Sequence, residues 1–287
     1  MHDRAQAAGA LGAVVEEVER ETPLGDAVEQ PAVEELHAGE EKGCDFALAA
    51  PPRSAMVLAA GLGTRLRPVT QTIPKPLVEI NGRALIDHAI DRLALAGVER
   101  LVVNIHYKAA MVAQHLAHWD HPQIELSEEA ELLDTGGGVA RALPLLGEAF
   151  FVVNGDVLWL DSKDPALSRL ARAFDPADTD AVLLLQRTVT AVGYEGSGDY
   201  FLDSLRRPRR RREREVAPYI FAGIQLLHRR LFEEPPGAVF SLVRLFDRAE
   251  AAGRLRAIVH DGEWYHIGTP EGLAATRERL SSHRIER

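Results

Sequence analysis

From residue 55 onward, short apolar runs alternate with longer stretches whose apolar positions have helical spacing. Residues 55–60 form the first run, which is closed by Gly61 and is typical of a buried parallel strand. Residues 83–97 predict an amphipathic helix that ends at Gly97, a favourable residue at a helix C-terminus. The same alternation predicts further strands at 101–105, 124–127, 150–153 and 181–186, and helices at 108–118, 137–146 and 165–174.

This order of elements is typical of an α/β protein, because strands that alternate with helices form a sheet with helices on both faces. We therefore expect one domain over residues 55–287, with a Rossmann-like, doubly wound mixed sheet. Thr135 is expected to cap the helix at 137–146. The later segments predict strands at 200–205, 219–227, 257–260 and 264–267, a helix at 240–252, and a final helix that starts at Pro270 with Thr269 as N-cap.

The net charge of −10 comes mainly from residues 1–54, which hold twelve acidic and four basic residues. Their low apolar content predicts a disordered or loosely helical acidic extension. A wrongly assigned start codon and a segment that docks on a partner are the alternatives. The remaining residues are nearly neutral, which is not typical of a nucleic-acid-binding protein. The arginine-rich run at 206–214 is expected to be the solvated tip of a hairpin.

Several classes of protein are disfavoured by the composition. No apolar run approaches the roughly 18 residues that a membrane span requires, so no membrane span is expected. The N-terminus shows no basic segment followed by an apolar core, so no signal peptide is expected either. Cys44 is the single cysteine, so no internal disulfide can form, and a cytoplasmic location fits. The hydrophobic fraction of 46% is sufficient for a sizeable core. The sequence leaves the oligomeric state open.

The glycines of Gly61-Leu62-Gly63 directly follow the first predicted strand. In an open α/β sheet, ligands bind beyond the carboxyl ends of the strands. Glycines at that place let backbone N–H groups approach phosphate oxygens, although a tight turn without a ligand is the alternative. The segment is neither a Walker loop nor a dinucleotide-binding G-x-G-x-x-G.

The longer pattern Gly61-x-Gly63-Thr64-Arg65-Leu66-x-Pro68-x-Thr70, followed by Pro74-Lys75-Pro76, resembles the signature of sugar-1-phosphate nucleotidylyltransferases. The resemblance covers roughly residues 55–287 and includes the segments 133–138 and 154–156. It implies a fold of the nucleotide-diphospho-sugar transferase type. It also implies that the phosphate of a sugar 1-phosphate attacks the α-phosphate of a nucleoside triphosphate and releases pyrophosphate. Such catalysis needs positioning and charge neutralisation rather than a protein nucleophile.

The resemblance assigns roles to individual residues. Arg65 would hold the β- and γ-phosphates, Lys75 would bridge the α-phosphate and the sugar phosphate, and Asp156 would hold Mg²⁺. The structural alternatives are a surface salt bridge, a solvated loop lysine and an aspartate in a strand-end turn. The residues implied to bind the nucleotide are Leu58, Ala59, Ala60, Gly61, Gly63, Thr64, Glu129, Thr135 and Gly136, and those implied to bind the sugar are Gly137, Asn154 and Asp199.

The chain departs from the family pattern at two places. Many members carry Trp-x-Asp-x-Gly-Thr, whose aspartate is the second metal ligand, whereas this chain has His266 at that position. A nitrogen ligand suits Mn²⁺ better than Mg²⁺, so we expect Mg²⁺ as cofactor with Mn²⁺ possible. His266 either binds the metal, directly or through water, or makes structural hydrogen bonds. Residues 181–222 also lack the Glu-Lys-Pro of the thymidylyl branch, which disfavours glucose-1-phosphate thymidylylation.

Short single-domain members with these segments resemble the uridylyltransferases that act on N-acetylmuramate 1-phosphate in peptidoglycan recycling. The resemblance therefore implies UTP and N-acetylmuramate 1-phosphate as substrates, with no nucleic-acid or membrane partner. Mannose-1-phosphate guanylyl transfer is the alternative reaction. A catalytically silent paralogue that binds nucleotide sugars and regulates a partner is the alternative of another class, and His266 is the feature that favours it.

Overall fold

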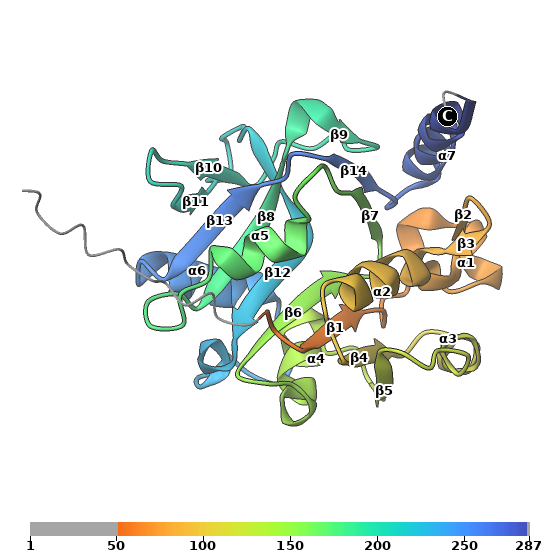
Figure 1. Ribbon diagram of the computed structural model, residues 1–287, viewed down its shortest axis with the longest axis horizontal. Helices are drawn as coiled ribbons and strands as arrows, with labels where there is room; N and C mark the ends of the chain where they lie inside the picture. Colours follow the sequence, from red (N-terminus) through yellow and green to blue (C-terminus); the bar gives the residue numbers. More distant parts are fainter. Residues whose placement is uncertain (1–50, 286–287) are drawn as a thin grey trace, which may run out of the picture. The chain divides into compact units, whose positions relative to one another are not determined.

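A computed structural model describes residues 51–285 of the chain. A mixed sheet of nine strands runs through them (Figure 1). These strands are β1 (Ser54–Leu58), β4 (Arg100–Ile105), β5 (Gln123–Glu128), β6 (Ala149–Asn154), β8 (Ala181–Arg187), β10 (Tyr200–Leu202), β11 (Pro208–Arg210), β12 (Tyr219–His228) and β13 (Leu255–Val259).

The parallel part of the sheet is centred on β1. β4 and β6 flank β1 in parallel, and β5 continues the parallel part beyond β4. β12 then pairs antiparallel with both β6 and β8, and β13 lies parallel to β8. The parallel arrangement brings the carboxyl ends of β1, β4 and β6 to one edge, where ligands bind in open α/β sheets.

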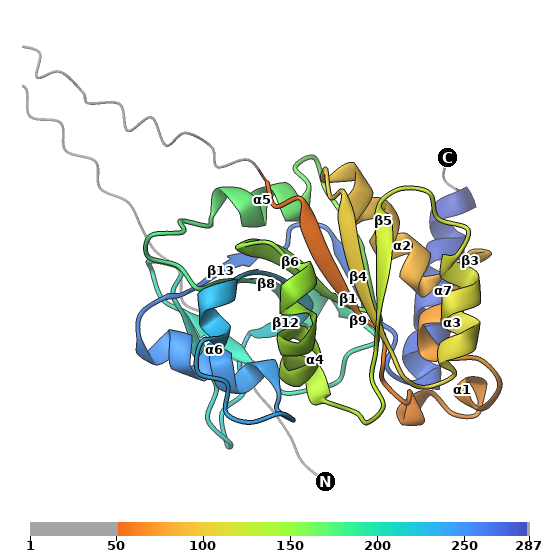
Figure 2. The ribbon, with the colours of Figure 1, turned by 90° about the horizontal axis from the view of Figure 1, so that it is seen from below.

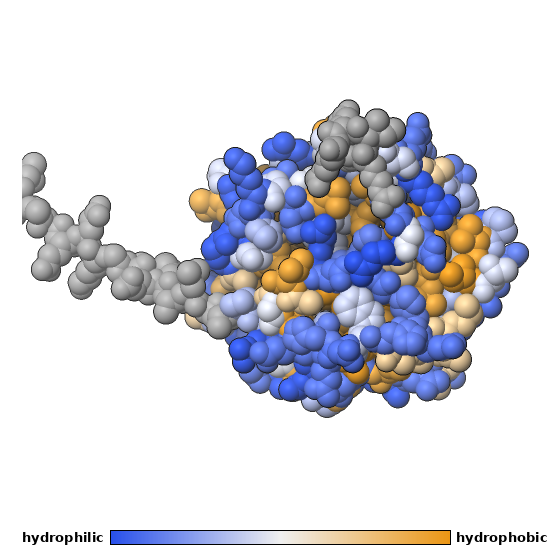
Figure 3. Space-filling view, turned by 45° about the vertical axis from the view of Figure 1, so that its right-hand side comes forward, coloured by the Kyte–Doolittle hydropathy of each residue, from blue (hydrophilic) through white to orange (hydrophobic). Residues whose placement is uncertain are grey.

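Helices cover both faces of the sheet. α2 (Leu85–Leu95), α3 (Ala109–Leu116) and α5 (Ala166–Arg172) contribute apolar side chains to the core on one face. α4 (Asp134–Ala142) and α6 (Leu242–Ala251) contribute to the core on the other face and lie side by side in Figure 2. The doubly wound mixed sheet expected from the sequence is thus confirmed. The face drawn in Figure 3 is mainly hydrophilic, with apolar patches between the polar residues.

A smaller three-stranded sheet, in the order β7-β14-β9, adjoins the site described below. A third core cluster joins residues that follow β1 to this sheet and to the last helix, through contacts that include Leu66, Tyr265 and Leu273. The elements around this smaller sheet are β7 (Val157–Leu160), β9 (Ala191–Val192), β14 (Glu263–His266), the hairpin of β2 (Glu79–Ile80) and β3 (Arg83–Ala84), α1 (Val69–Thr72) and α7 (Pro270–Ile285).

None of the helices within residues 51–285 is long and apolar enough to cross a membrane.

Each strand and helix predicted from the sequence is present, with ends that differ by a few residues. Thr269 caps α7 as expected, because its Oγ1 accepts a hydrogen bond of 3.2 Å from the Gly272 amide. The elements that were not predicted, among them α1, β2, β3, β9 and β11, have two to four residues each and are too short to show a period.

Thr135 is not the N-cap that the sequence predicts. α4 begins earlier, at Asp134, and Leu133 holds the N-cap position. Thr135 lies inside the first turn, where its Oγ1 accepts a hydrogen bond of 2.9 Å from the Leu242 amide at the start of α6. The hydroxyl therefore joins two helices instead of capping one.

The arginine-rich run is only partly the hairpin tip that was expected, although most of its arginines are exposed. Residues 208–210 form β11, which pairs antiparallel with β10, so the tip lies at 203–207. Arg209 lies over the Phe201 ring and donates to Glu215 at 2.8 Å. Arg210 makes two hydrogen bonds, of 2.5 and 2.7 Å, to Asp247 of α6. Carboxylates and an aromatic ring thus engage these cations within the molecule.

The predicted acidic extension, 1–54, lies outside the described residues except for its last four positions. Ser54 already belongs to β1, is buried, and accepts a hydrogen bond of 3.0 Å from the Gly147 amide. The boundary between the extension and the folded domain stays a prediction.

Candidate active site

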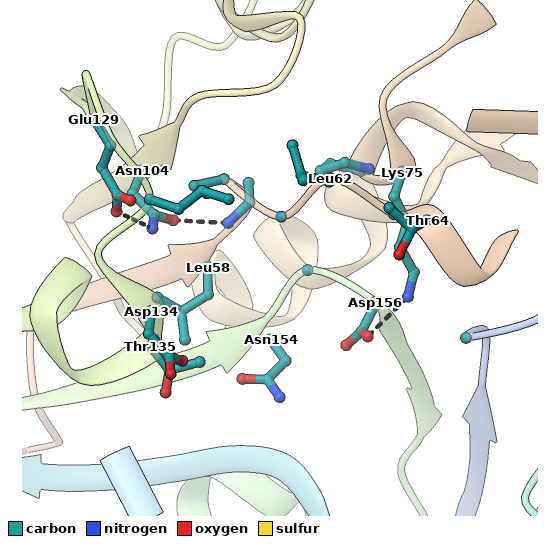
Figure 4. A pocket seen from close by; sticks show the side chains of 18 of the residues that line it. Leu58, Leu62, Thr64, Lys75, Asn104, Glu129, Asp134, Thr135, Asn154 and Asp156 are labelled. Carbon is teal, nitrogen blue, oxygen red and sulfur yellow. Dashed lines mark hydrogen bonds and ion pairs between the residues drawn. The ribbon is translucent and has the colours of Figure 1, made fainter. Parts of the chain in front are cut away.

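A cavity of about 630 Å³ opens at the carboxyl ends of the parallel strands (Figure 4). β1 ends at Leu58, which is paired with Asn104 of β4 on one side and with Asn154 of β6 on the other. All three residues line the cavity. The chain then leaves the sheet as the loop of residues 59–63, so the predicted phosphate-binding glycines lie at the wall of this cavity.

Gly63 has a positive φ of 63° and a crowded position. A Cβ atom there would lie 2.9 Å from Thr70 Cγ2 and 3.3 Å from Lys75 Cβ. Thr70 Oγ1 donates a hydrogen bond of 2.7 Å to the Gly63 carbonyl, and Tyr107 donates one of 2.8 Å to the Thr70 carbonyl. Glycine is therefore required for the loop to pack against the segment that carries Lys75.

Lys75 forms an ion pair with Asp156, with 2.8 Å between Nζ and Oδ2. Lys75 begins the short 3₁₀ helix η2 (Lys75–Leu77) between Pro74 and Pro76, and it is only 9% exposed. Burial by itself raises the pKa of Asp156, but the Lys75 ammonium outweighs that effect, so the pKa lies below its ordinary value. The carboxylate is therefore ionised at neutral pH and ready to bind a cation.

Arg65 lies on the 3₁₀ helix η1 (Thr64–Leu66) and lines the same cavity. Its side chain is exposed and makes no hydrogen bond or ion pair with any residue between 51 and 285. Two cations, one fixed by Asp156 and one without such a partner, thus border the space beside the glycine loop. This arrangement suits a ligand with several negative charges.

Most of the residues implied by the resemblance meet in this cavity, and four do not line it. The lining includes Leu58, Ala59, Ala60, Gly61, Gly63, Thr64, Arg65, Lys75, Glu129, Thr135, Asn154 and Asp156. Gly136 and Gly137 are buried in α4, where their amides donate to the Phe240 carbonyl. A Cβ atom at Gly136 would lie 2.3 Å from Phe240 Cε2, so this glycine makes room for packing of the chain before α6.

Asp199 lies apart, in a hollow of about 720 Å³ between the β10–β12 region and α6. Its Oδ2 accepts a hydrogen bond of 2.9 Å from the Phe221 amide, and burial raises the pKa of its carboxyl. The structure does not bring Asp199 to the cavity that the other implied residues share.

His266 ends β14 and lies close enough to Asp156 for each group to affect the pKa of the other. Burial lowers the pKa of His266, and the Asp156 carboxylate opposes that effect. The imidazole stacks on Trp264 with a centroid distance of 5.9 Å and makes no hydrogen bond within residues 51–285. A Cβ atom at Gly268 would lie 2.1 Å from His266 Nε2, so Gly268 leaves room for the ring.

Some lining residues have no place among the sequence predictions. Asn104 is the most informative, because it is a polar residue in the otherwise apolar run of residues 101–105. That contrast is a signal that could have identified it. Leu62, Leu132 and Val239 also line the cavity while remaining 40%, 37% and 58% exposed. Exposed apolar side chains at a cavity wall can contact an apolar part of a ligand.

Comparison with known proteins supports the family resemblance described for the sequence. Residues 54–194 match the nucleotidyl transferase family. The chain is 42% identical over 236 residues to N-acetylmuramate alpha-1-phosphate uridylyltransferase of Caulobacter vibrioides, a match that covers 80% of this chain and 98% of that protein. The enzyme of the same name from Neisseria meningitidis serogroup B is 33% identical, with coverage of 75% and 93%.

Two further matches differ in the share of each chain that they cover. Mannose-1-phosphate guanyltransferase of Hypocrea jecorina is 41% identical, but only over 109 residues, which are 36% of this chain and 30% of that protein. The crystal structure of UDP-glucose pyrophosphorylase complexed with UDP-glucose matches with a TM-score of 0.65 and 17% identity, and covers 82% of this chain and 100% of that one. The second match concerns the fold alone.

Proposed function

Since this chain belongs to the nucleotidyl transferase family, we propose that it transfers the uridylyl group of UTP to N-acetylmuramate 1-phosphate. The reaction class, nucleotidyl transfer to a sugar 1-phosphate, is common to its relatives. The choice of base and sugar rests on the Caulobacter and Neisseria enzymes, whose matches extend over nearly their whole lengths. The products would be UDP-N-acetylmuramate and pyrophosphate.

The observation that carries the proposal is the single cavity in which the glycine loop, Arg65 and the Lys75–Asp156 pair meet. The reaction brings two phosphorylated, negatively charged substrates together. An oxygen of the sugar phosphate attacks the α-phosphorus, a new P–O bond forms, the bond between the α-phosphorus and the bridging oxygen breaks, and pyrophosphate leaves with the electron pair. Fixed cations and backbone amides at such a place lower the barrier by stabilising charge that develops on the phosphates.

In this proposal Lys75 lies between the two reacting phosphates, and Arg65 holds the pyrophosphate part of UTP. Lys75 is suited to its role because burial and two flanking prolines fix it. Arg65 is suited to its role because it is exposed and lines the cavity. Asn154, on the opposite side of the β1 end from Asn104, would face the sugar.

Enzymes of this family generally use a divalent metal, which supplies positive charge to the phosphates when bound. Mg²⁺ is commonly held by one or two carboxylates together with substrate phosphates. Asp156 fits that requirement, since only its Oδ2 is engaged, by Lys75, and Oδ1 has no hydrogen-bond partner within residues 51–285. Residues 51–285 contain no group of three or more side chains that could hold a metal ion by themselves. Because Asp156 meets the requirement of a carboxylate beside the substrate phosphates, we infer that it would hold Mg²⁺ and that His266 would stand near it.

The two alternatives make different demands on the site. Guanylyl transfer to mannose 1-phosphate is supported by a 41% identical match, but that match is confined to about a third of each chain. A silent nucleotide-sugar-binding paralogue would not need the fixed Lys75–Asp156 pair.

The cytoplasmic location expected from the sequence stays a prediction.

A substrate matrix tests the proposal. Pyrophosphate release is measured for the four nucleoside triphosphates against N-acetylmuramate 1-phosphate, N-acetylglucosamine 1-phosphate and mannose 1-phosphate, with Mg²⁺ and with Mn²⁺. We expect the highest kcat/KM for UTP with N-acetylmuramate 1-phosphate. The highest value for GTP with mannose 1-phosphate would favour the guanylyl alternative, and no release with any pair would favour the silent paralogue.

A further inference from the structure

Asn104 and Glu129 form a buried polar pair in the cavity wall, and each is 3% exposed. Asn104 Nδ2 donates a hydrogen bond of 2.7 Å to Glu129 Oε1, and Asn104 Oδ1 accepts one of 2.7 Å from the Ala59 amide (Figure 4). The three residues therefore form a continuous chain of hydrogen bonds from the end of β5 to the first residue of the glycine loop.

The Asn104 side chain takes the place of a backbone acceptor. The parallel pairing of β1 with β4 ends at Leu58 and Asn104, after which the loop leaves the sheet. Within a parallel ladder, the next amide of β1 would donate to a carbonyl of the neighbouring strand. Here the Ala59 amide donates to the side chain instead. On the other flank, the Gly155 amide donates to the Leu58 carbonyl at 2.9 Å, so both neighbouring strands hold the start of the loop.

Glu129 is itself held rigidly. Its amide donates to the Ile105 carbonyl at 2.9 Å, and its own carbonyl lies 2.8 Å from His106 Nδ1. Its Oε2 accepts a hydrogen bond of 3.1 Å from the Leu133 amide. Both carboxylate oxygens are therefore occupied within the protein, and their direction fixes the direction of the Asn104 amide.

The neighbouring helix leaves space for this pair. A Cβ atom at Gly138 of α4 would lie 2.8 Å from Glu129 Oε1 and 3.0 Å from Asn104 Nδ2. Any larger residue would push the two side chains away from their observed positions. The positions of Asn104 and Glu129 therefore depend on the glycine at position 138.

We propose that Asn104 is a positioning residue of the nucleotide site, oriented by Glu129, and that it holds the loop of residues 59–63 in the conformation that receives the triphosphate. The inference rests on the proposed function only in taking the ligand to be a nucleoside triphosphate. A loop that is ordered before binding loses less conformational freedom when the nucleotide arrives, so the affinity is higher. Loss of the bond to Ala59 should therefore weaken nucleotide binding and raise the KM for UTP more than the KM for the sugar 1-phosphate.

An exchange of the two polar groups tests this inference. In Asn104→Asp, two carboxylates face each other without a donor. In Glu129→Gln, one acceptor oxygen is lost, and the new NH₂ group faces a donor. In the double variant, the carboxylate at position 104 can accept from the Ala59 amide and from the side-chain amide at position 129, whose oxygen can still accept from Leu133. All three hydrogen bonds are restored, with the charge moved by one side chain.

We expect each single variant to bind UTP at least about tenfold more weakly, as removal of a buried hydrogen-bond partner commonly costs that factor or more. The double variant should bind within about threefold of wild type, because residues of one network are not additive. Glu128→Gln is the matched control: it removes the same charge from an exposed neighbouring position and should leave UTP binding unchanged.

UTP and GTP binding is measured by calorimetry, with KM values and thermal unfolding of all five proteins. A double variant as weak as the single variants overturns the inference, and so do single variants that unfold at lower temperature but bind UTP normally. If the wild type binds UTP but turns over no sugar 1-phosphate, the proposed function fails, while the binding data still decide the role of Asn104. A wild type that binds neither nucleotide overturns both.

Discussion

Lys75 Nζ lies 2.8 Å from Asp156 Oδ2, although the two residues are 81 positions apart in the chain. The pair joins the segment after the glycine loop to the end of β6. It also compensates the charge of a lysine that is 9% exposed, so the cation is held in place before any phosphate arrives. A preorganised cation is effective in catalysis because it does not have to be reoriented during the reaction.

Lys75→Ala should therefore lower kcat with UTP and the sugar 1-phosphate by roughly 10²-fold or more, the effect expected from removal of one preorganised electrostatic contact. The measurement is steady-state pyrophosphate release with both substrates saturating. Lys163→Ala removes an exposed lysine outside the cavity and should keep the wild-type rate. Equal rates in the two variants would mean that Lys75 does not act on the phosphates.

Gly223→Ala should impair use of the sugar 1-phosphate. Gly223 has a φ of 75° and lies in β12, where the register with β8 shifts between Phe221 and Gln225. A Cβ atom there would lie 2.9 Å from Asn154 Nδ2, so alanine would displace the side chain that we propose faces the sugar. The KM for the sugar 1-phosphate should rise several-fold more than the KM for UTP.

Gly253→Ala controls for backbone strain. Gly253 has a φ of 68°, and a Cβ atom there meets nothing within 4 Å. Both alanine variants should lose stability by about 1–2 kcal/mol, the usual cost of a left-handed conformation for a residue with a side chain. Only Gly223→Ala should change the KM for the sugar 1-phosphate. The same KM in both variants would show that Gly223 has no effect on the sugar site.

The sequence was sufficient for the elements that are marked by a local pattern of apolar residues. β1, β4 and β6 are buried on both faces, so each gives a short apolar run. The candidate site residues in the contiguous segments 58–65 and 154–156 line one cavity, because they follow parallel strands that end at one edge, and their roles stay a prediction. The uridylyltransferase resemblance is supported by relatives matched over almost their entire lengths.

The errors arose where distant residues decide the structure. β11 consists of Pro208 and two arginines, and its pairing is accompanied by bonds from Arg210 to Asp247 and Glu250, 37 and 40 positions away. No local pattern reports such partners. Threonine is a common N-cap residue, yet the Thr135 hydroxyl accepts a hydrogen bond from the Leu242 amide of another helix. Asn104 required knowledge that β1 turns out of the sheet beside it.

His266→Asp should raise the ratio of activity with Mg²⁺ to activity with Mn²⁺. The imidazole is close to Asp156, and Gly268 leaves room for a side chain at this position. An oxygen ligand suits Mg²⁺ better than a nitrogen ligand does. The measurement is a titration of each metal on wild type and variant, with the exposed His118→Asp as control. An unchanged ratio would show that His266 does not contact the metal, and its role would then be packing against Trp264.

Asp180 provides a test of stability that does not depend on the active site. It directly precedes β8 and accepts hydrogen bonds from Arg230, in the 3₁₀ helix η5 (Arg229–Phe232), and from Arg254, which precedes β13. Its side chain is 15% exposed. Burial by itself raises the pKa of Asp180, but the hydrogen bonds from the two arginines outweigh that effect and hold the pKa below its ordinary value.

A carboxylate whose pKa is lowered on folding stabilises the protein above the pKa of the unfolded state, about 3.9, and loses that contribution as the pH falls through the lower pKa of the folded state. Asp180→Asn should therefore lower the free energy of unfolding by about 2 kcal/mol at pH 7, the order expected for hydrogen bonds to a charged group. The difference from wild type should shrink as the pH falls below about 3.9, because Asp180 of the unfolded state binds a proton there and Asp180 of the folded state does so at lower pH. Urea unfolding of both proteins between neutral and acidic pH measures this difference. Asp164→Asn, which breaks an exposed pair with Arg172, should change stability by less than about 1 kcal/mol at any pH. A difference between wild type and Asp180→Asn that stays constant over the whole range would mean that the ionised carboxylate is not what stabilises this junction.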